Sequence, residues 1–285
     1  MITPSEMHKS ARMRLVIIAL LTATMFVLPM ASAPRARAND AWLTVEQKAR
    51  ADALISVFEN DTPFTRYDYH EVLGDGRGMT VGRGFTTATG DALRVVNIYT
   101  SRVHVNRLAA HLPILQQLAA EGIPSDDTRL PSSLGDDWAT TANSDPSFRA
   151  AQDLVNDERS YQPAMQLADE QLGGGVSALG RVILYDTVFM HGNGPDPDGA
   201  PALVARTIAM IGQPDESSGD GHWWTTFLEV RRADMLNPAN SATRDEWARA
   251  VGRVDVLLGL VHAEKWDFAG PIEVRGGGYT PANIP

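Results

Sequence analysis

The 285-residue chain contains no cysteine. This absence excludes a disulfide scaffold and every cysteine-based metal or redox site, so the folded protein depends on its apolar core. Hydrophobic residues make up 44% of the sequence, which is enough for one large domain or for two lobes with a substantial core. We expect most of the six tryptophans to belong to that core.

Several well-known catalytic signatures are also missing from the sequence. It has no Walker A motif, no H-E-x-x-H motif and no G-x-S-x-G nucleophile elbow. Basic patches interleaved with aromatic residues are absent, so we expect no nucleic-acid partner. The segment 196–199 (DPDG) lacks the further acids and closing glutamate of an EF-hand, so we interpret it as a turn. We therefore expect no metal and no other cofactor.

Long apolar runs are scarce too. The run Leu15–Pro29 holds about 15 residues, fewer than the roughly 20 that a membrane-spanning helix needs. Three basic residues precede it: Lys9, Arg12 and Arg14. Small-x-small cleavage sites end at Ala33 and Ala38, so residues 1–38 are typical of a secretory signal peptide. We expect a secreted or periplasmic protein without a membrane contact after cleavage; an uncleaved anchor is the alternative.

Negative charge dominates the chain after residue 38. The formal net charge of the whole sequence is −10, and residues 1–38 carry five basic residues and one acidic residue. The remaining chain therefore has 20 basic and 34 acidic residues and a net charge of −14. Such a protein repels nucleic acid and attracts polycations. The alternative is that the acidity serves solubility alone.

A helix-like run ends at Glu59. Four apolar residues precede it at the i, i+3, i+4 and i+7 spacing of one helix face: Ala51, Leu54, Ile55 and Phe58. Glu59 continues this stripe, which predicts a carboxyl group partly removed from water near a helix C-terminus. Both conditions raise the pKa of a carboxyl group, and a general acid needs its proton. The alternative is a side chain at the edge of the stripe that reaches into water.

A second carboxylate, Asp75, has the opposite surroundings. It lies in the turn GDGRG between glycines that leave backbone N–H groups uncovered, and Arg77 is close. Hydrogen bonds and a neighbouring cation both favour the ionised form, which suits a general base that activates water. An ordinary Asp-Gly turn is the alternative. Together Glu59 and Asp75 resemble an acid and base pair with divergent pKa values, which glycoside hydrolysis requires.

The remaining pattern is largely helical. We expect a first helix over Trp42–Asn60, with Thr44 as N-cap and Gln47 completing a capping box. A short strand within Arg66–Leu73, a hairpin within Gly74–Gly90, a helix from Asp91 and a loop over 123–137 should follow. The rest of the chain should contain two helices within Trp138–Gln171 broken near Asp145, a joint and candidate lobe boundary at Gly173–Gly175, helices over Val176–Met190, Ala202–Ile211, Trp223–Leu236 and Asp245–Leu260, and an irregular end. Helical spacing also lets Arg231 reach Asp186, which needs a partner if it is buried.

Seven pieces occur in the order found in one enzyme family: FEN, GDGRGMT, TGD, DDWATTA, NDER, LYDTVFMHG and FLEVRRADML. From Ala41 to Pro271 the chain resembles chitosanases of glycoside hydrolase family 46. The resemblance implies a mainly α, lysozyme-like, two-lobed helical fold with a small β-sheet beside the active-site cleft. It also implies one catalytic domain of two lobes over residues 39–285, which we expect to be a monomer. The implied substrate is chitosan, a polycation, and the implied reaction is hydrolysis of its β-1,4 bonds with inversion.

The same resemblance assigns roles to individual residues. Glu59 matches the general acid, Asp75 the general base and Thr80 the residue that places the attacking water. The positions that match substrate-binding or supporting residues are Arg77, Asp91, Tyr69, Asp186, His191 and Arg231, with Arg244 as a further arginine beneath the acid. Among these, Asp91 is the one we expect to bind a glucosamine amine, because a carboxylate pairs with an ammonium group.

The chain also departs from the family. Met79 stands where a tyrosine is usual, the loop from Asp75 to Asp91 is one residue short with Arg83 near its centre, and the region of Thr65 lacks a tryptophan found in some members. Two alternatives therefore stay open: a peptidoglycan-cleaving hydrolase of similar fold, and a non-catalytic polysaccharide-binding protein. The charge of −14 argues against the first, and the presence of both carboxylates argues against the second.

Overall fold

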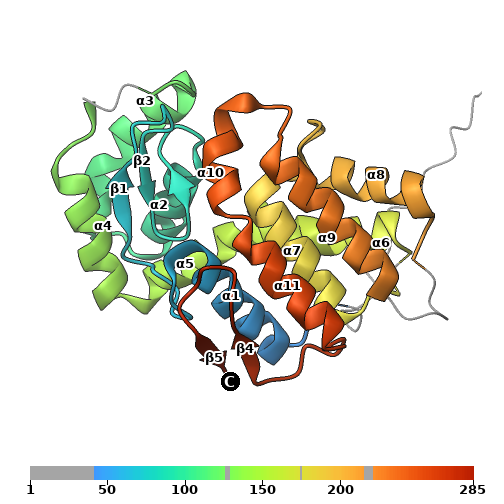
Figure 1. Cartoon of the computed structure of the whole chain (residues 1–285). Helices are drawn as coiled ribbons and strands as arrows, with labels where there is room; N and C mark the ends of the chain where they lie inside the picture. The colour runs from blue at the N-terminus through green and yellow to red at the C-terminus, as the bar shows by residue number, and fades with distance from the viewer. Residues whose placement is uncertain (1–41, 126–128, 174, 215–220) are drawn as a thin grey trace, which may run out of the picture. The chain divides into compact units, whose positions relative to one another are not determined.

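The computed structural model describes residues 42–125, 129–173, 175–214 and 221–285. These residues belong to one compact unit, Asp40–Pro285, and the expected signal peptide lies outside them. Most of the described chain is helical, with a small antiparallel sheet, as Figure 1 shows. The expected mainly α fold with a small sheet is confirmed. No helix among the described residues is both long enough and apolar enough to cross a bilayer.

Helix α1 (Val45–Asn60) ends as expected and begins three residues after the expected Trp42, directly behind the predicted N-cap Thr44. The Thr44 side chain accepts the Gln47 backbone N–H while the Gln47 side chain accepts the Thr44 N–H, so the capping box is complete. The helix ends at Asp61, whose backbone is left-handed with φ 53°. The predicted apolar stripe is buried. Its extension, Glu59, is instead exposed.

The three-stranded sheet follows α1. Strands β1 (His70–Val72), β2 (Met79–Val81) and β3 (Phe85–Thr86) pair antiparallel in sequence order. Thr80 lies opposite Glu71 on one side and Thr86 on the other. This confirms the short strand expected before Gly74 and the hairpin expected after it.

One group of helices packs on this sheet. Its members are α2 (Asp91–Arg102), α3 (Leu112–Glu121), α4 (Ser133–Ser144) and α5 (Pro146–Asn156). Their apolar faces form one core around Trp138, which is fully buried. The predicted loop over 123–137 is too long, because α4 already begins at Ser133. Leu134 and Trp138 occupy the same buried face of α4, and this burial stabilises the additional turn.

A second core lies among α1 and the later helices (Figure 1). These are α6 (Gln162–Gln171), α7 (Ala178–His191), α8 (Ala200–Ile211), α9 (Gly221–Leu236), α10 (Arg244–Arg249) and α11 (Gly252–His262). The prediction of a single helix over Asp245–Leu260 is wrong, because this stretch forms two helices, α10 and α11. Gly252 lies at the division, and a Cβ there would lie 1.8 Å from the carbonyl oxygen of Gly277, so the close approach requires glycine.

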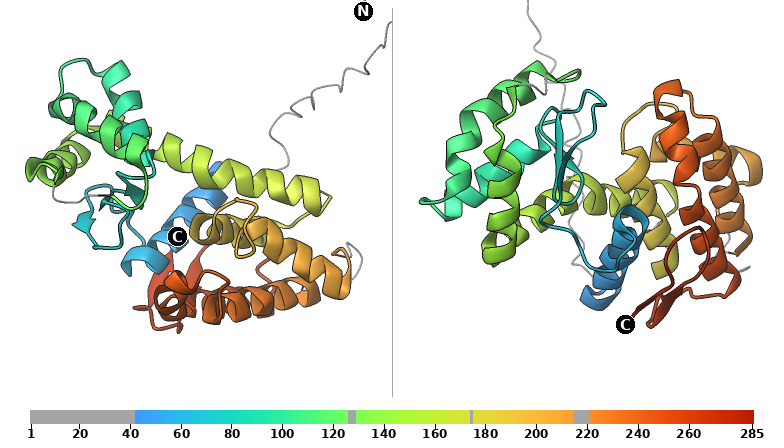
Figure 2. Two further views of the ribbon diagram at one scale, coloured as in Figure 1. Left: turned by 90° about the horizontal axis from the view of Figure 1, so that it is seen from above. Right: turned by 60° about the vertical axis from the view of Figure 1, so that its left-hand side comes forward.

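A short π-helix, Asp157–Tyr161, lies at the change from one core to the other. Val155 belongs to the first core and Tyr161 to the second. Figure 2 shows α5, the π-helix and α6 as one long yellow-green run that leads from the first group of helices to the second. The boundary expected at Gly173–Gly175 is wrong, because residues before and after it share the second core; Gly174 itself lies outside the described residues.

The C-terminal segment is ordered rather than irregular. Strands β4 (Ile272–Val274) and β5 (Ala282–Ile284) pair antiparallel. Between them, the backbone N–H and hydroxyl of Thr280 donate to the carboxylate of Asp61, at 2.7 and 2.6 Å. Arg50 of α1 donates to the carbonyl of Pro285 at 2.8 Å. These contacts hold the segment against α1, which composition alone does not predict.

Candidate active site

Glu59 lies one residue before the end of α1, and its partner is an arginine. Arg253 Nη2 donates to Glu59 Oε1 at 2.5 Å. The Glu59 side chain stays 37% exposed, whereas that of Arg253 is 3% exposed. The burial expected of Glu59 is therefore not observed, because the apolar stripe ends at Phe58, whose ring lies 5.4 Å from the Arg253 guanidinium. The structure holds Glu59 by an ion pair at the surface of the core.

A buried chain of charges continues from Arg253. Arg253 Nη1 lies 3.1 Å from Asp186 Oδ1, and Arg231 Nη1 lies 2.6 Å from Asp186 Oδ2. Asp186 and Arg231 are both fully buried. The predicted pairing of Arg231 with Asp186 is confirmed. The chain of contacts therefore pairs two guanidinium groups with two carboxylates, the buried Asp186 and the partly exposed Glu59, and this pairing offsets the cost of burying the ions.

His191 closes this chain of contacts at the last residue of α7. Arg231 Nε donates to His191 Nε2 at 3.2 Å, so Nε2 carries no proton, and Nδ1 donates to the carbonyl of Asp198 at 3.0 Å. Burial and the positive charge of Arg231 hold the pKa of His191 well below its usual value. His191 and Asp186 are buried, so their contribution to the site is support of other residues.

Asp75 is fixed by Arg77 in the turn between β1 and β2. Arg77 donates its backbone N–H to Asp75 Oδ1 at 2.9 Å and its Nε–H to Oδ2 at 2.8 Å. Partial burial alone would raise the pKa of Asp75, but these hydrogen bonds and the Arg77 charge outweigh it and hold the pKa below its usual value. The hydrogen bonds and the neighbouring cation expected around Asp75 are present.

The glycines of this turn have a structural requirement. Gly76 and Gly78 have φ values of 78° and 80°, which residues with a Cβ rarely adopt. A Cβ on Gly78 would also lie 2.0 Å from the hydroxyl oxygen of Thr87. That hydroxyl accepts the backbone N–H of Met79 at 3.1 Å. The turn is therefore fastened to the sheet immediately beyond Arg77.

Arg77 also contacts the other group of helices. Its Nη2 lies 3.7 Å from Glu246 Oε2 of α10. The Glu246 side chain is exposed and that of Arg77 is partly exposed, so this pair adds little to stability. Its importance is positional, since it brings α10 to the turn that carries Asp75. Glu246 was not predicted as a site residue, and it has no sequence signal beyond being an acid in a helix.

Thr80 and Tyr69 lie on the hairpin beyond this turn. Thr80 is half-buried in the middle of β2. The Tyr69 carbonyl accepts the Gly82 N–H at 2.8 Å, and its hydroxyl donates to Glu71. Partial burial, with the Glu71 carboxylate, raises the pKa of Tyr69 to about 12, so its hydroxyl keeps its proton. Met79, where the family usually has a tyrosine, is buried in the first core and is not a surface group.

Asp91 begins α2 and is paired on one oxygen. Arg159 Nη1 and the Thr89 hydroxyl both contact Asp91 Oδ2, at 3.1 and 3.2 Å. Its side chain is 27% exposed. Arg159 comes from the π-helix and, like Arg253, was missed by sequence reasoning. Arg244 is exposed, with Nη2 at 3.4 Å from Asn237 Oδ1, and Arg253 rather than Arg244 joins the buried chain of charges.

Within the described residues, no group of three or more His, Asp or Glu side chains is arranged to hold a metal ion. The segment 196–199 is a turn in which Asp196 Oδ1 accepts the Asp198 N–H at 3.1 Å. The Asp198 carboxylate accepts the backbone N–H groups of Ala239 and Asn240, both at 2.8 Å. Asp198 thus has a structural function, which agrees with the interpretation of segment 196–199 as a turn.

Comparison with known proteins gives consistent matches over nearly all of the chain. The profile of glycosyl hydrolase family 46 matches residues 53–272. A chitosanase from Bacillus subtilis (strain 168) is 46% identical over 276 residues, which cover 96% of this chain and 97% of that protein. A chitosanase from a Streptomyces species is 31% identical, covering 81% of this chain and 84% of that protein.

Solved structures give the same result. A mutant chitosanase from Bacillus subtilis MY002 complexed with 6 GlcN matches with a TM-score of 0.77 and 46% identity, covering 85% of this chain and all of that chain. A chitosanase from Gynuella sunshinyii in complex with chitotetraose matches with a TM-score of 0.77 and 42% identity, covering 85% of this chain and 99% of that chain. The two-lobed, lysozyme-like helical fold is therefore shared.

Proposed function

The chain belongs to glycosyl hydrolase family 46, and from this premise we propose that it is a chitosanase that cleaves β-1,4 bonds of chitosan with inversion at the anomeric carbon. The observation that carries the proposal is a pair of carboxylates, each held by its own arginine: Glu59 by Arg253, and Asp75 by Arg77. An inverting glycosidase requires two such groups, one as acid and one as base. The relatives named chitosanase support chitosan as the substrate.

In this mechanism Glu59 protonates the glycosidic oxygen. Arg253 contacts Oε1, which leaves Oε2 to carry and donate the proton. The Glu59 side chain is 37% exposed in the free protein, so a bound polysaccharide chain can reach it and cover it. The acid function thus depends on bound substrate more than on burial within the fold.

Asp75 removes a proton from the attacking water. Its carboxylate is ionised because Arg77 contacts both oxygens: Nε and Nη2 lie 2.8 and 2.7 Å from Oδ2, while Oδ1 accepts the Arg77 backbone N–H and keeps a second lone pair that can accept from water. Thr80 on β2 holds this water, while Tyr69 contacts the sugar. The water attacks the anomeric carbon from the face opposite to the leaving oxygen, so the product has the inverted configuration.

Substrate amines pair with acidic groups. Arg159 and Thr89 contact Oδ2 of Asp91, and we assign Oδ1 to a glucosamine ammonium group. The net charge of −14 outside residues 1–38 attracts the polycation over a longer range. Asp186, His191 and Arg231 support Arg253 from below and do not touch the sugar.

The proposal is tested by reducing-end release from highly deacetylated chitosan. We expect the wild-type protein to be active and Glu59→Gln to lose activity by about 100-fold or more. Glu170→Gln, an exposed acid on α6, is the matched control and should keep full activity. Proton NMR of early products should show the α-anomer first; a β-anomer would contradict inversion.

An inactive wild-type protein would contradict the substrate assignment. Chitin and peptidoglycan are then the next substrates, and binding of chitosan without cleavage of any of the three would favour a polysaccharide-binding protein. We also propose that the protein is exported with cleavage after Ala33 or Ala38 and that it acts as a monomer. Mass spectrometry of the protein from the culture medium and light scattering test these two points.

A further inference from the structure

Arg83 is a buried cation outside the site described above. It lies between two glycines in the turn that joins β2 to β3, and its side chain is only 5% exposed. None of the roles assigned above uses it. A buried guanidinium group needs partners, and the elements that supply them show what it connects.

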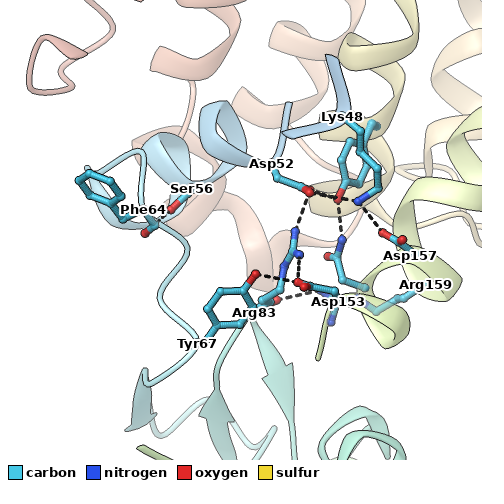
Figure 3. A network of polar contacts seen from close by, with 11 residues as sticks. Lys48, Asp52, Ser56, Phe64, Tyr67, Arg83, Asp153, Asp157 and Arg159 are labelled. Atoms are coloured by element: carbon cyan, nitrogen blue, oxygen red, sulfur yellow. Dashed lines mark hydrogen bonds and ion pairs between the residues drawn. The ribbon is translucent and has the colours of Figure 1, made fainter. Parts of the chain in front are cut away.

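Two carboxylates from different helices pair with Arg83 (Figure 3). Its Nη2 lies 2.8 Å from Asp52 Oδ1 on α1, and its Nη1 lies 2.6 Å from Asp153 Oδ1 on α5. We call these three residues the Arg83 bridge. The planar fork of an arginine can hold two acceptors in fixed directions, which a lysine ammonium cannot do.

Further contacts fix the acidic ends of the Arg83 bridge. Asp52 accepts from the Tyr185 hydroxyl at 2.7 Å and from Lys48 at 3.0 Å. Asp153 accepts from the Tyr67 hydroxyl at 2.9 Å. Burial alone would raise the pKa of Asp52, but the charges of Arg83 and Lys48 outweigh it and hold that pKa below its usual value. The Asp52 end of the bridge thus carries its charge opposite Arg83.

The backbone of the same turn is held separately. Arg159 of the π-helix donates to the carbonyls of Gly84 and Arg83, at 3.0 and 3.3 Å. Its guanidinium also lies 5.2 Å from the ring of Phe85. The turn therefore contacts α1, α5 and the π-helix at once, and this is where the chain passes from the first core to the second.

The Arg83 bridge joins the two elements that carry the proposed catalytic pair, helix α1 and the hairpin that follows the turn of Asp75. Asp52 is seven residues, or about two helical turns, before Glu59 on α1. Arg83 is three residues after Thr80, just beyond the end of β2. β2 directly follows the turn of Asp75, and the backbone of that turn is tied to the end of the hairpin, since the Ala88 N–H donates to the Arg77 carbonyl at 3.2 Å. A short and rigid path thus leads from the acid to the water-holding threonine.

We propose that Arg83 is a positioning residue that sets the distance between Glu59 and the hairpin carrying Thr80 and Asp75. The proposal rests on the proposed function, because it concerns the geometry of that reaction. In inverting enzymes the two carboxyl groups are roughly 6.5–9.5 Å apart to leave room for water. A shift of about 1 Å in such a site can reduce the rate by about 100-fold.

The test compares two Arg83 variants with a matched surface control. Arg83→Met keeps the length of the side chain and removes its charge, and Arg83→Lys keeps the charge but can hold one helix at a time. Arg94→Met removes an exposed pair with Glu158 and is the control. In Arg83→Met we expect kcat on chitosan to fall by about 10- to 100-fold while KM changes by less than about threefold. Arg83→Lys should recover only part of the loss.

Two further readouts separate positioning from a general loss of structure. Guanidinium ion at concentrations below those that denature should raise kcat of Arg83→Met and leave Arg94→Met unchanged, because the ion fills the place of the lost group. Hydrogen exchange at the amides of Gly82 and Thr87, which donate across the hairpin, should become faster in Arg83→Met without substrate. A kcat within about twofold of wild type, or unchanged exchange at these amides, would overturn the proposal.

The experiment stays decisive if Arg83→Met does not fold or if the proposed function is wrong. If Arg83→Met does not fold, Asp153→Asn replaces it, because Asp153 is 40% exposed and Arg83 keeps Asp52; an unchanged kcat in that variant overturns the proposal. If the wild-type protein releases no reducing ends, the proposed function fails. Hydrogen exchange then still decides whether Arg83 fixes the hairpin to α1.

Discussion

Arg253 donates to Glu59 across 194 positions of the sequence, with 2.5 Å between Nη2 and Oε1. The same guanidinium group binds Asp186 of α7 through Nη1 at 3.1 Å. The position of the proposed acid on α1 is thus set by α11 and α7, and α9 contributes through Arg231. Substitution of any of these buried groups should therefore displace Glu59 and lower the rate of the reaction.

Replacement of Arg253 should affect both stability and activity. In Arg253→Met, Asp186 loses one of two buried partners, and breaking a buried pair costs about 3–5 kcal/mol of unfolding free energy. We also expect kcat to fall by about 10-fold or more, because Glu59 loses its orientation. Urea denaturation and chitosan hydrolysis measure the two effects. Arg275→Met, which removes an exposed pair with Glu273, is the control, and an equal effect in both variants would contradict the assignment.

Asp75→Asn should abolish activity with little effect on folding. The amide cannot accept the water proton, so we expect kcat to fall by about 100-fold or more. Asp75 lies in an exposed turn, and the backbone N–H of Arg77 can still donate to the amide oxygen, so the thermal midpoint should change little. An active Asp75→Asn would exclude Asp75 as the base. The lowered pKa also predicts that, in the wild-type protein, the pH profile of kcat/KM loses the basic group at a lower pH than an ordinary aspartate would give.

His191 should make the protein less stable in mild acid. Burial and the Arg231 charge keep its pKa well below the ordinary value, whereas in the unfolded chain it binds a proton near pH 6.5. Below that pH the unfolded state binds more protons, so the free energy of unfolding falls as pH falls. His191→Gln keeps a donor and an acceptor and removes the titration. Urea denaturation should show that the advantage of wild type over His191→Gln shrinks by about 1 kcal/mol from pH 7 to pH 5.5. A difference independent of pH would contradict this.

Asp61→Ala should release the C-terminal strands from α1. The carboxylate accepts two hydrogen bonds from Thr280, and alanine removes both. We expect faster hydrogen exchange at the amides of β5 than in wild type, without a change at the hairpin of β1 to β3. Asp267→Ala offers a comparison, since Asp267 caps a nearby turn by accepting the N–H of Ala269. Equal exchange at β5 in wild type and Asp61→Ala would show that strand pairing alone holds the segment.

The features that could be predicted from sequence are those set by near neighbours. The capping box of Thr44 and Gln47 and the ionised Asp75 depend on residues no more than three positions away. The pairing of Arg231 with Asp186 was predicted because each lies on the apolar face of its own long helix. In each case the local spacing leaves few alternative partners for a polar group.

The features that could not be predicted depend on distant segments. The stripe on α1 gives the direction of Glu59 but not what covers it, and the structure leaves it 37% exposed beside Arg253. The C-terminal strands are three residues each and are stabilised by pairing and by Asp61, whereas the glycine-rich segment between them suggests an irregular end. The π-helix and Arg159 within it have no signal in the periodicity.

The distance in sequence between Glu59 and Arg253, and between Asp61 and Thr280, has a consequence for biosynthesis. Helix α1 is made well before these partners, yet its C-terminal end is completed by residues near position 253 and beyond position 271. Contacts between such distant residues form slowly during folding. A chain whose translation stops early, or that a protease cuts before α11, thus retains the acidic residue without the partner that orients it. Catalytic competence in this protein is acquired at the end of synthesis, and enzymatic activity therefore reports the fraction of chains that have been completed and folded.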